Sequence, residues 1–136
     1  MVSWDEIKEF FSSFGKDFMD LLKVGATWEY RILDRPDLVW HIVKGEDGLP
    51  KVVEGSAEKP DAILFYNEKT LEWIIKNTAR DEKGRPIAED FYKKWKEIHD
   101  HPRPGFDTYW ELKISLGRLK RKGYMEFAKK YGLLTE

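Results

Sequence analysis

His99, Asp100 and His101 bring metal-ligand residue types close together in the sequence. Two imidazoles and a carboxylate are ligands that zinc accepts, and Pro102 directly after them favours a loop. Side chains this close at a helix end do not face one another, however, and the pattern identifies no third converging ligand. A histidine at a helix C-terminus also interacts favourably with the helix dipole. We therefore expect no metal site here.

His41 is the other residue able to do chemistry, because it lies in the apolar run 38–43. Its imidazole is either a sheet histidine with a satisfied hydrogen bond or a polar group in a cavity, where a pKa near neutrality would suit acid–base catalysis. Nucleophilic catalysis would need a serine in a glycine elbow, a pattern that the serines here lack. We expect a chain that binds without catalysis and needs no cofactor. The alternative is an accessory enzyme domain for a hydrophobic substrate, using His41 or the His99 and His101 pair.

Aromatic side chains are the most informative feature, since the chain has 6 Trp, 6 Tyr and 8 Phe. A close-packed core favours Leu, Ile and Val, because the indole N–H and the phenol O–H need partners when buried. Large rings are instead suited to the wall of an apolar cavity, although ordinary core packing uses the same residues. The rings that we expect to line such a cavity are Trp28, Trp40, Phe65, Trp73, Trp95 and Trp110.

A basic run, Arg-Leu-Lys-Arg-Lys, occupies 118–122. Such a run is most often a solvated sheet edge, where lysines prevent pairing with other chains. It also suits nucleic-acid phosphates, anionic lipid headgroups or a ligand carboxylate. If a lipid-binding cavity exists, we expect Lys120 and Lys122 to hold the carboxylate headgroup.

Composition bounds the class of protein. With 136 residues and no cysteine, the sequence indicates a single domain, 1–136, without disulfides or a thiolate nucleophile. Lys and Arg total 24 against 25 Asp and Glu, so net charge does not favour nucleic-acid binding. The acidic start is unlike a signal peptide and no apolar run is long enough to span a membrane, so we expect a cytoplasmic protein with at most transient membrane contact. Abundant Lys and Glu with no Gln is typical of heat-adapted proteins.

The first half of the chain predicts one helix and a sheet. Ser3 and Glu6 form a capping box for an amphipathic, aromatic helix within residues 1–23. Alternation over 26–32 predicts a half-buried strand, which forms a hairpin with the run 38–43. Further strands are expected at 51–55 and 62–66, and an antiparallel meander is the economical arrangement.

The second half predicts mainly helices. Asn67 is a good N-cap for a helix ending near Asn77, and a second amphipathic helix is expected around 87–99, ended by the proline-rich loop that follows. The remaining predictions are a helix over 106–116, an edge strand over 117–123 and a final helix over 124–131.

Two stretches resemble the sterol carrier protein type 2 (SCP2) domain family. One runs from Glu54 through Lys59-Pro60-Asp61 into a strand and helix, and the other is Gly117-Arg-Leu-Lys-Arg-Lys-Gly123 before the last helix. The resemblance covers residues 26–133 in order of elements. It implies an α+β fold with a five-stranded, mostly antiparallel sheet covered by helices, with an added N-terminal aromatic helix and an inserted helix around 87–99.

The family implies a tunnel between sheet and helices that holds a fatty acyl chain, an isoprenoid or a sterol-like lipid, and no catalytic residues. Leu119 and Met125 fall on the family pattern and are the further residues expected to line that tunnel. We expect binding and transfer of such a lipid or another apolar small molecule. The alternative is a protein-interaction or oligomerisation module, such as a homodimer, in which the core is filled and exposed aromatic residues mediate assembly.

Overall fold

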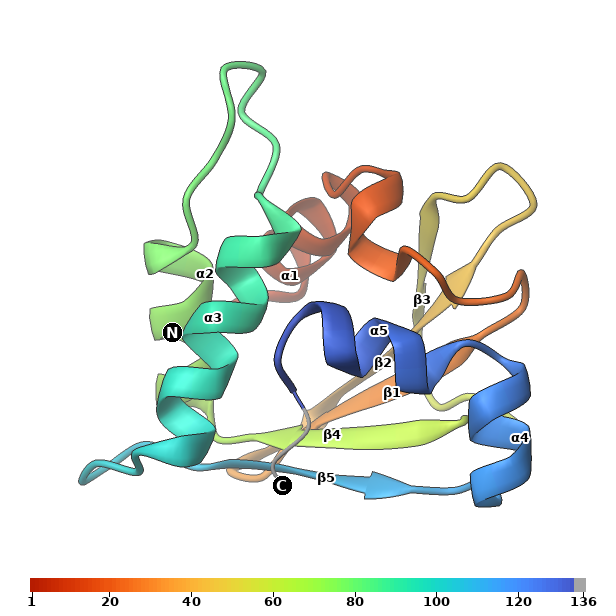
Figure 1. Ribbon diagram of the computed structural model, residues 1–136. Coiled ribbons are helices and arrows are strands. Elements are labelled where there is room, and N and C mark those ends of the chain that lie inside the picture. The colour runs from red at the N-terminus through yellow and green to blue at the C-terminus, as the bar shows by residue number, and fades with distance from the viewer. Residues whose placement is uncertain (134–136) are drawn as a thin grey trace.

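The computed structural model describes residues 1–133, which form a five-stranded mixed sheet with helices gathered on one face (Figure 1). The elements in chain order are α1 (Trp4–Ser12), a 3-10 helix η1 (Lys16–Met19), β1 (Thr27–Ile32), β2 (Arg35–Lys44), β3 (Pro50–Glu54), β4 (Ala62–Tyr66), α2 (Glu68–Asn77), α3 (Ala88–Asp100), β5 (Thr108–Leu112), α4 (Leu116–Arg121) and α5 (Tyr124–Lys130). The expected α+β class and five-stranded sheet are confirmed, although the fifth strand is not the one predicted.

The strands lie in the order β3-β2-β1-β4-β5, so β1 is at the centre of the sheet. β1 pairs with β4 in parallel, whereas the β1–β2, β2–β3 and β4–β5 pairs are antiparallel. The expected meander is therefore wrong in one pairing, although the sheet is mostly antiparallel as expected. The chain crosses from β3 at one edge to β4 beside the central strand. This crossover brings Trp28 and Tyr30 of β1 and Tyr66 of β4 onto one face.

The N-terminal helix is shorter than its apolar pattern predicts. It begins with the expected capping box, in which Ser3 Oγ accepts from the Glu6 N–H at 3.2 Å. It ends at Ser12, because the Ser13 hydroxyl donates to the Glu9 carbonyl and Gly15 takes an extended conformation. The apolar periodicity continues through η1, so Phe18 is buried although the α-helix has ended.

For two neighbouring segments the predicted element type is wrong, because a strand forms where a helix was predicted and a helix forms where a strand was predicted. Residues 106–116 contain the strand β5 instead of a helix, and its Tyr109 stacks on Phe65 of β4 with ring centroids 4.6 Å apart. The run 117–123, predicted as an edge strand, contains α4, because Ser115 caps a helix by accepting from the Arg118 N–H.

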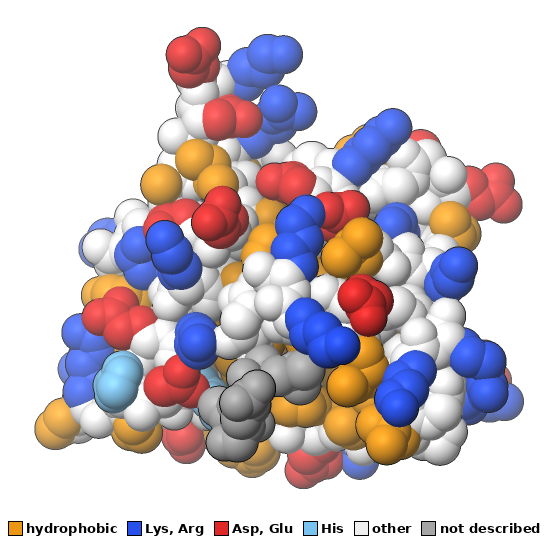
Figure 2. Space-filling view, in the orientation of Figure 1, with side chains coloured by type: hydrophobic (Ala, Val, Ile, Leu, Met, Phe, Trp, Pro, Cys, Tyr) orange, Lys and Arg blue, Asp and Glu red, His pale blue; other side chains and the backbone are white. Residues whose placement is uncertain are grey.

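One face of the sheet is buried against the helices. Alternate residues of β1, Trp28, Tyr30 and Ile32, are buried there, and Phe18 of η1 packs on Trp28 with ring centroids 5.6 Å apart. Lys and Arg side chains alternate with Asp and Glu over the face in Figure 2, as the near-neutral charge predicts. Within residues 1–133, no helix is both long and apolar enough to cross a membrane.

Candidate functional site: an aromatic cavity between sheet and helices

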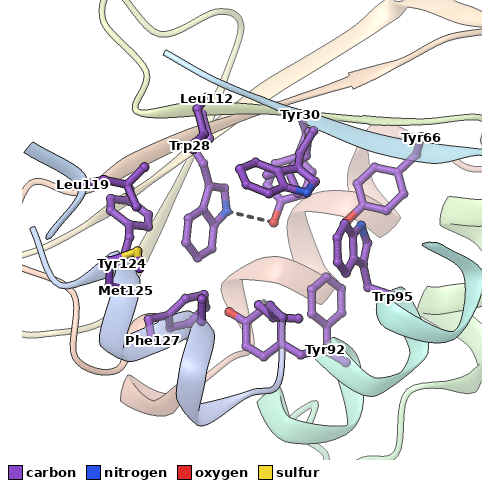
Figure 3. Close-up of a pocket in the computed structure, with 16 residues that line it drawn as sticks. Trp28, Tyr30, Tyr66, Tyr92, Trp95, Leu112, Leu119, Tyr124, Met125 and Phe127 are labelled. Carbon is purple, nitrogen blue, oxygen red and sulfur yellow. Dashed lines mark hydrogen bonds between the residues drawn. The ribbon is translucent and has the colours of Figure 1, made fainter. Parts of the chain in front are cut away.

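A cavity of about 130 Å³ lies between the sheet and the helices (Figure 3). The sheet supplies one wall, with side chains from β1, β4 and β5, and α3, α4 and α5 supply the others. Every described residue that lines the cavity is aromatic, aliphatic or methionine, and none carries a formal charge. Burial of apolar surface is therefore the main interaction that this wall offers a ligand.

Five of the predicted lining residues lie in this wall. Trp28 comes from the central strand, Trp95 from α3, Trp110 from β5, Leu119 from α4 and Met125 from α5. The structure thus brings together residues that are far apart in sequence. Whether they bind a ligand stays a prediction.

Three other residues that were predicted to line the cavity do not line it. Trp40 is fully buried in the core on the α1 side, where its indole stacks on the Tyr30 ring with an interplanar angle of 4°. Phe65 points to the opposite face of the sheet because residues alternate along β4, whose Ala62 and Tyr66 line the cavity. Trp73 lies on α2, where the Arg103 guanidinium sits 4.6 Å from its ring centroid.

Neither lysine predicted to hold a headgroup lines the cavity. Lys122 Nζ lies 2.6 Å from the Asp61 Oδ1 carboxylate oxygen, and Lys120 is exposed on α4. The other Asp61 oxygen accepts from the Tyr124 hydroxyl at 2.7 Å and from the Thr27 N–H at 2.9 Å. Asp61 is itself 2% exposed, so this cluster fastens α4 and α5 to the sheet. We call it the Asp61 latch.

The histidines do not contribute to the cavity wall. His41 lies on the sheet face opposite the helices, and its Nδ1 is 2.8 Å from the Gly55 carbonyl oxygen. His99 stacks on Trp95 and contacts Asp100 through its Nδ1 at 3.1 Å. No group of three His, Cys, Asp or Glu side chains placed to hold a metal occurs within residues 1–133.

Sequence reasoning missed the tyrosines of the wall, namely Tyr30, Tyr66, Tyr92 and Tyr124. Strand alternation in the sequence predicts two of these positions. Tyr30 is two residues from Trp28 and therefore lies on the same face of the strand. Tyr66 follows Ala62 and Leu64 in the same way along β4.

Most polar tips in the wall have partners. Figure 3 shows the Trp28 indole N–H donating to the Tyr30 hydroxyl, at 2.8 Å. The Trp95 N–H donates to the Thr108 hydroxyl at 3.0 Å, and the Tyr92 hydroxyl donates to the Phe18 carbonyl. These bonds hold each ring in one orientation, so the wall is rigid without any strongly polar surface.

The Tyr66 hydroxyl is the exception, because it is buried and has no hydrogen-bond partner among residues 1–133. Burial raises the pKa of Tyr66, and of Tyr30, Tyr92 and Tyr124 in the same wall, so all four stay neutral at pH 7. An anionic ligand would therefore enter a cavity that offers it no cation from the described residues.

Comparisons with known proteins give distant structural similarity. No protein-family model and no curated protein matches the chain. A solved structure described as "UbiJ-SCP2 Ubiquinone synthesis protein" is similar to it, with a TM-score of 0.45 and 10% sequence identity over 93% of this chain and 90% of that one.

Proposed function

We propose that this protein binds a small apolar molecule, of the lipid class, in the aromatic cavity. The observation that supports the proposal is the wall itself, because side chains from three strands and three helices surround a space that they do not fill. Protein interiors are ordinarily close-packed, so space of this size is unusual. Binding without catalysis remains our proposal, since the wall offers neutral aromatic and aliphatic groups.

Cavity size limits the ligand portion that fits. An engineered apolar cavity of about 150 Å³ binds benzene, so about 130 Å³ holds one ring or a short stretch of chain. A longer acyl or isoprenoid chain would extend through the mouth beside β5, where Trp110 is 41% exposed and Leu112 is 46% exposed. We propose such a chain as the ligand in preference to a sterol ring system, which would need the helices to move apart.

The proposal is tested by filling the cavity. Ala62→Leu adds bulk to the cavity wall on β4, and Ala79→Leu adds the same atoms at an exposed position as a control. We expect the wild type and Ala79→Leu to bind a fluorescent fatty-alcohol probe, and Ala62→Leu to bind it at least about tenfold more weakly, because the lost apolar burial is worth about 1.5–3 kcal/mol. Fluorescence titration measures the dissociation constants. Equal affinities in all three proteins would contradict the proposal.

Native mass spectrometry of the purified protein is the complementary experiment. A co-purified molecule that leaves on denaturation would identify the ligand class directly. Its absence from Ala62→Leu prepared in parallel would place that molecule in the cavity.

A second candidate function is assembly through the sheet edge. β5 has a neighbour on one side only and exposes Tyr109, Trp110 and Leu112. Exposed apolar edge strands favour pairing with another chain. Light scattering over a range of concentrations separates the candidates, since assembly predicts a dimer that Tyr109→Lys dissociates.

A further inference from the structure

The mouth of the cavity lies beside a surface that is both apolar and basic. Leu116, at the start of α4, is 62% exposed and follows closely after Trp110 and Leu112 of β5, which line the mouth. Figure 2 shows hydrophobic side chains gathered next to Lys and Arg over the region of α4 and α5. We call Trp110, Leu112, Leu116, Arg118, Lys120 and Arg121 the mouth patch.

Its three cations have no partner of their own. Within residues 1–133, no carboxylate lies within ion-pair distance of Arg118, Lys120 or Arg121, and all three are exposed. Neighbouring Lys122 differs, because the Asp61 latch engages it. The sequence 116–122 therefore presents positive charge on a short helix whose Leu119 is buried in the cavity wall.

Other cations near the patch are neutralised locally. Lys113 Nζ lies 3.1 Å from a Glu111 oxygen, and Lys129 Nζ lies 3.8 Å from a Glu126 oxygen. Three cations without a carboxylate partner therefore lie close together on α4, although the whole chain has a net charge of −1.

We propose that the mouth patch docks the protein on an anionic phospholipid bilayer. Positive charge attracts the negative membrane surface, and tryptophan and leucine beside it can enter the boundary between headgroups and acyl chains. Nucleic acid would use the cations but would leave the exposed leucines in water, so the combination favours a bilayer. Docking here places the mouth against the acyl chains. The proposal does not require the cavity to hold a ligand.

Charge reversal on α4 tests whether the three cations contribute to membrane docking. A triple variant, Arg118→Glu, Lys120→Glu and Arg121→Glu, is compared in vesicle co-sedimentation with wild type, using phosphatidylcholine vesicles with and without phosphatidylglycerol. Each cation near an anionic surface changes affinity about fivefold, so the variant should bind the mixed vesicles at least about a hundredfold more weakly. Wild-type binding should also weaken as salt rises.

A charge-matched control excludes an effect of net charge alone. Lys8, Lys76 and Lys93 are exposed on α1, α2 and α3 and neither line the cavity nor belong to the mouth patch. Their replacement by Glu changes the net charge equally. We expect this control to bind mixed vesicles within about threefold of wild type, because screening confines charge effects to about 10 Å.

Leu116→Ser tests whether the exposed apolar side chain contributes to membrane docking. Leu116 does not line the cavity, so the variant should keep wild-type affinity for the fatty-alcohol probe while binding mixed vesicles about tenfold more weakly. Ala62→Leu gives the reverse test, since it should lose the probe and still bind vesicles. Failure of the proposed function and failure of docking are thereby distinguished.

Three results would overturn the docking proposal. They are wild-type binding that does not depend on phosphatidylglycerol, equal loss in the α4 variant and its charge-matched control, and binding to duplex DNA in place of vesicles. Circular dichroism of each variant verifies that the fold is retained.

Discussion

The tyrosine hydroxyls of the cavity wall differ sharply in their surroundings, although the residues are chemically identical. Tyr124 donates to the buried Asp61 carboxylate, whereas the Tyr66 hydroxyl has no partner within the described chain. A hydrogen bond to a charged group stabilises a fold, and a buried hydroxyl without a partner costs free energy. The two residues therefore allow a matched comparison.

Tyr66→Phe should raise the free energy of unfolding by about 1 kcal/mol or leave it unchanged, because it removes only an unsatisfied group. Tyr124→Phe should lower it by about 1.5–3 kcal/mol, because it leaves a buried carboxylate with one partner fewer. Urea unfolding of the two variants measures both values. Clear destabilisation by Tyr66→Phe would mean that its hydroxyl has a partner after all.

The sequence correctly predicts which side chains line the cavity where the alternation of a strand, or the apolar stripe of a helix, determines the direction of the side chain. Trp28 lies on the helix-covered face as its alternation requires, and Trp95 follows from the apolar stripe of α3. Trp40 shares the buried face but lies further along the sheet, where α1 fills the space. Sequence gives the face of a strand; it does not give the position across the sheet.

At the scale of elements, the junction before α5 depends on one glycine. Gly123 has φ of 91°, and a Cβ built on it would lie 2.1 Å from the Leu21 carbonyl oxygen. The Lys23 N–H donates to the Lys122 carbonyl at 2.9 Å, so the two segments are held in close contact. The backbone on both sides would have to move to accommodate any side chain.

Gly123→Ala should therefore lower the free energy of unfolding by more than about 3 kcal/mol, combining left-handed strain with the collision. Gly25→Ala is the control, because Gly25 has φ of 90° and open space around the added atom. Strain alone should cost it about 1–2 kcal/mol. Thermal unfolding compares them, and equal losses would show that contact with Leu21 carries no extra cost.

Element types near the C-terminal end could not be read from the sequence, and the reason is physical. Residues 108–112 alternate weakly, and only pairing with β4 decides that they form a strand. The charges of 118–121 suit a sheet edge, yet Ser115 supplies a helix cap at the right distance. The parallel β1–β4 pairing depends on tertiary contacts that no local pattern records.

For the whole molecule, the buried tyrosines govern stability in alkali. Burial raises the pKa values of Tyr30, Tyr66, Tyr92 and Tyr124 above the ordinary value of 10.0. The unfolded chain loses these protons first as pH increases, so their contribution is fully present below pH 10 and declines above it. Each tyrosine should lower the free energy of unfolding by about 1.4 kcal/mol per pH unit in that range.

Urea midpoints from about pH 9 to about pH 11.5 check this decline, with near-ultraviolet phenolate absorbance recorded on the same samples. Above pH 10, Tyr66→Phe should make the free energy of unfolding fall less steeply with pH, by the contribution of one tyrosine. A free energy of unfolding that stays constant above pH 10 would contradict the burial of these four hydroxyls in the folded protein.

The Asp61 latch joins residues that are 63 positions apart, at Asp61 and Tyr124. Contacts of such long sequence separation form late during folding, because the entropy of closing the intervening loop must first be offset. The β1–β2 hairpin, by contrast, is local and can assemble early. We therefore expect a nascent chain to expose the aromatic face of the sheet before α5 covers it. We expect the cavity to be the last part of this molecule to form.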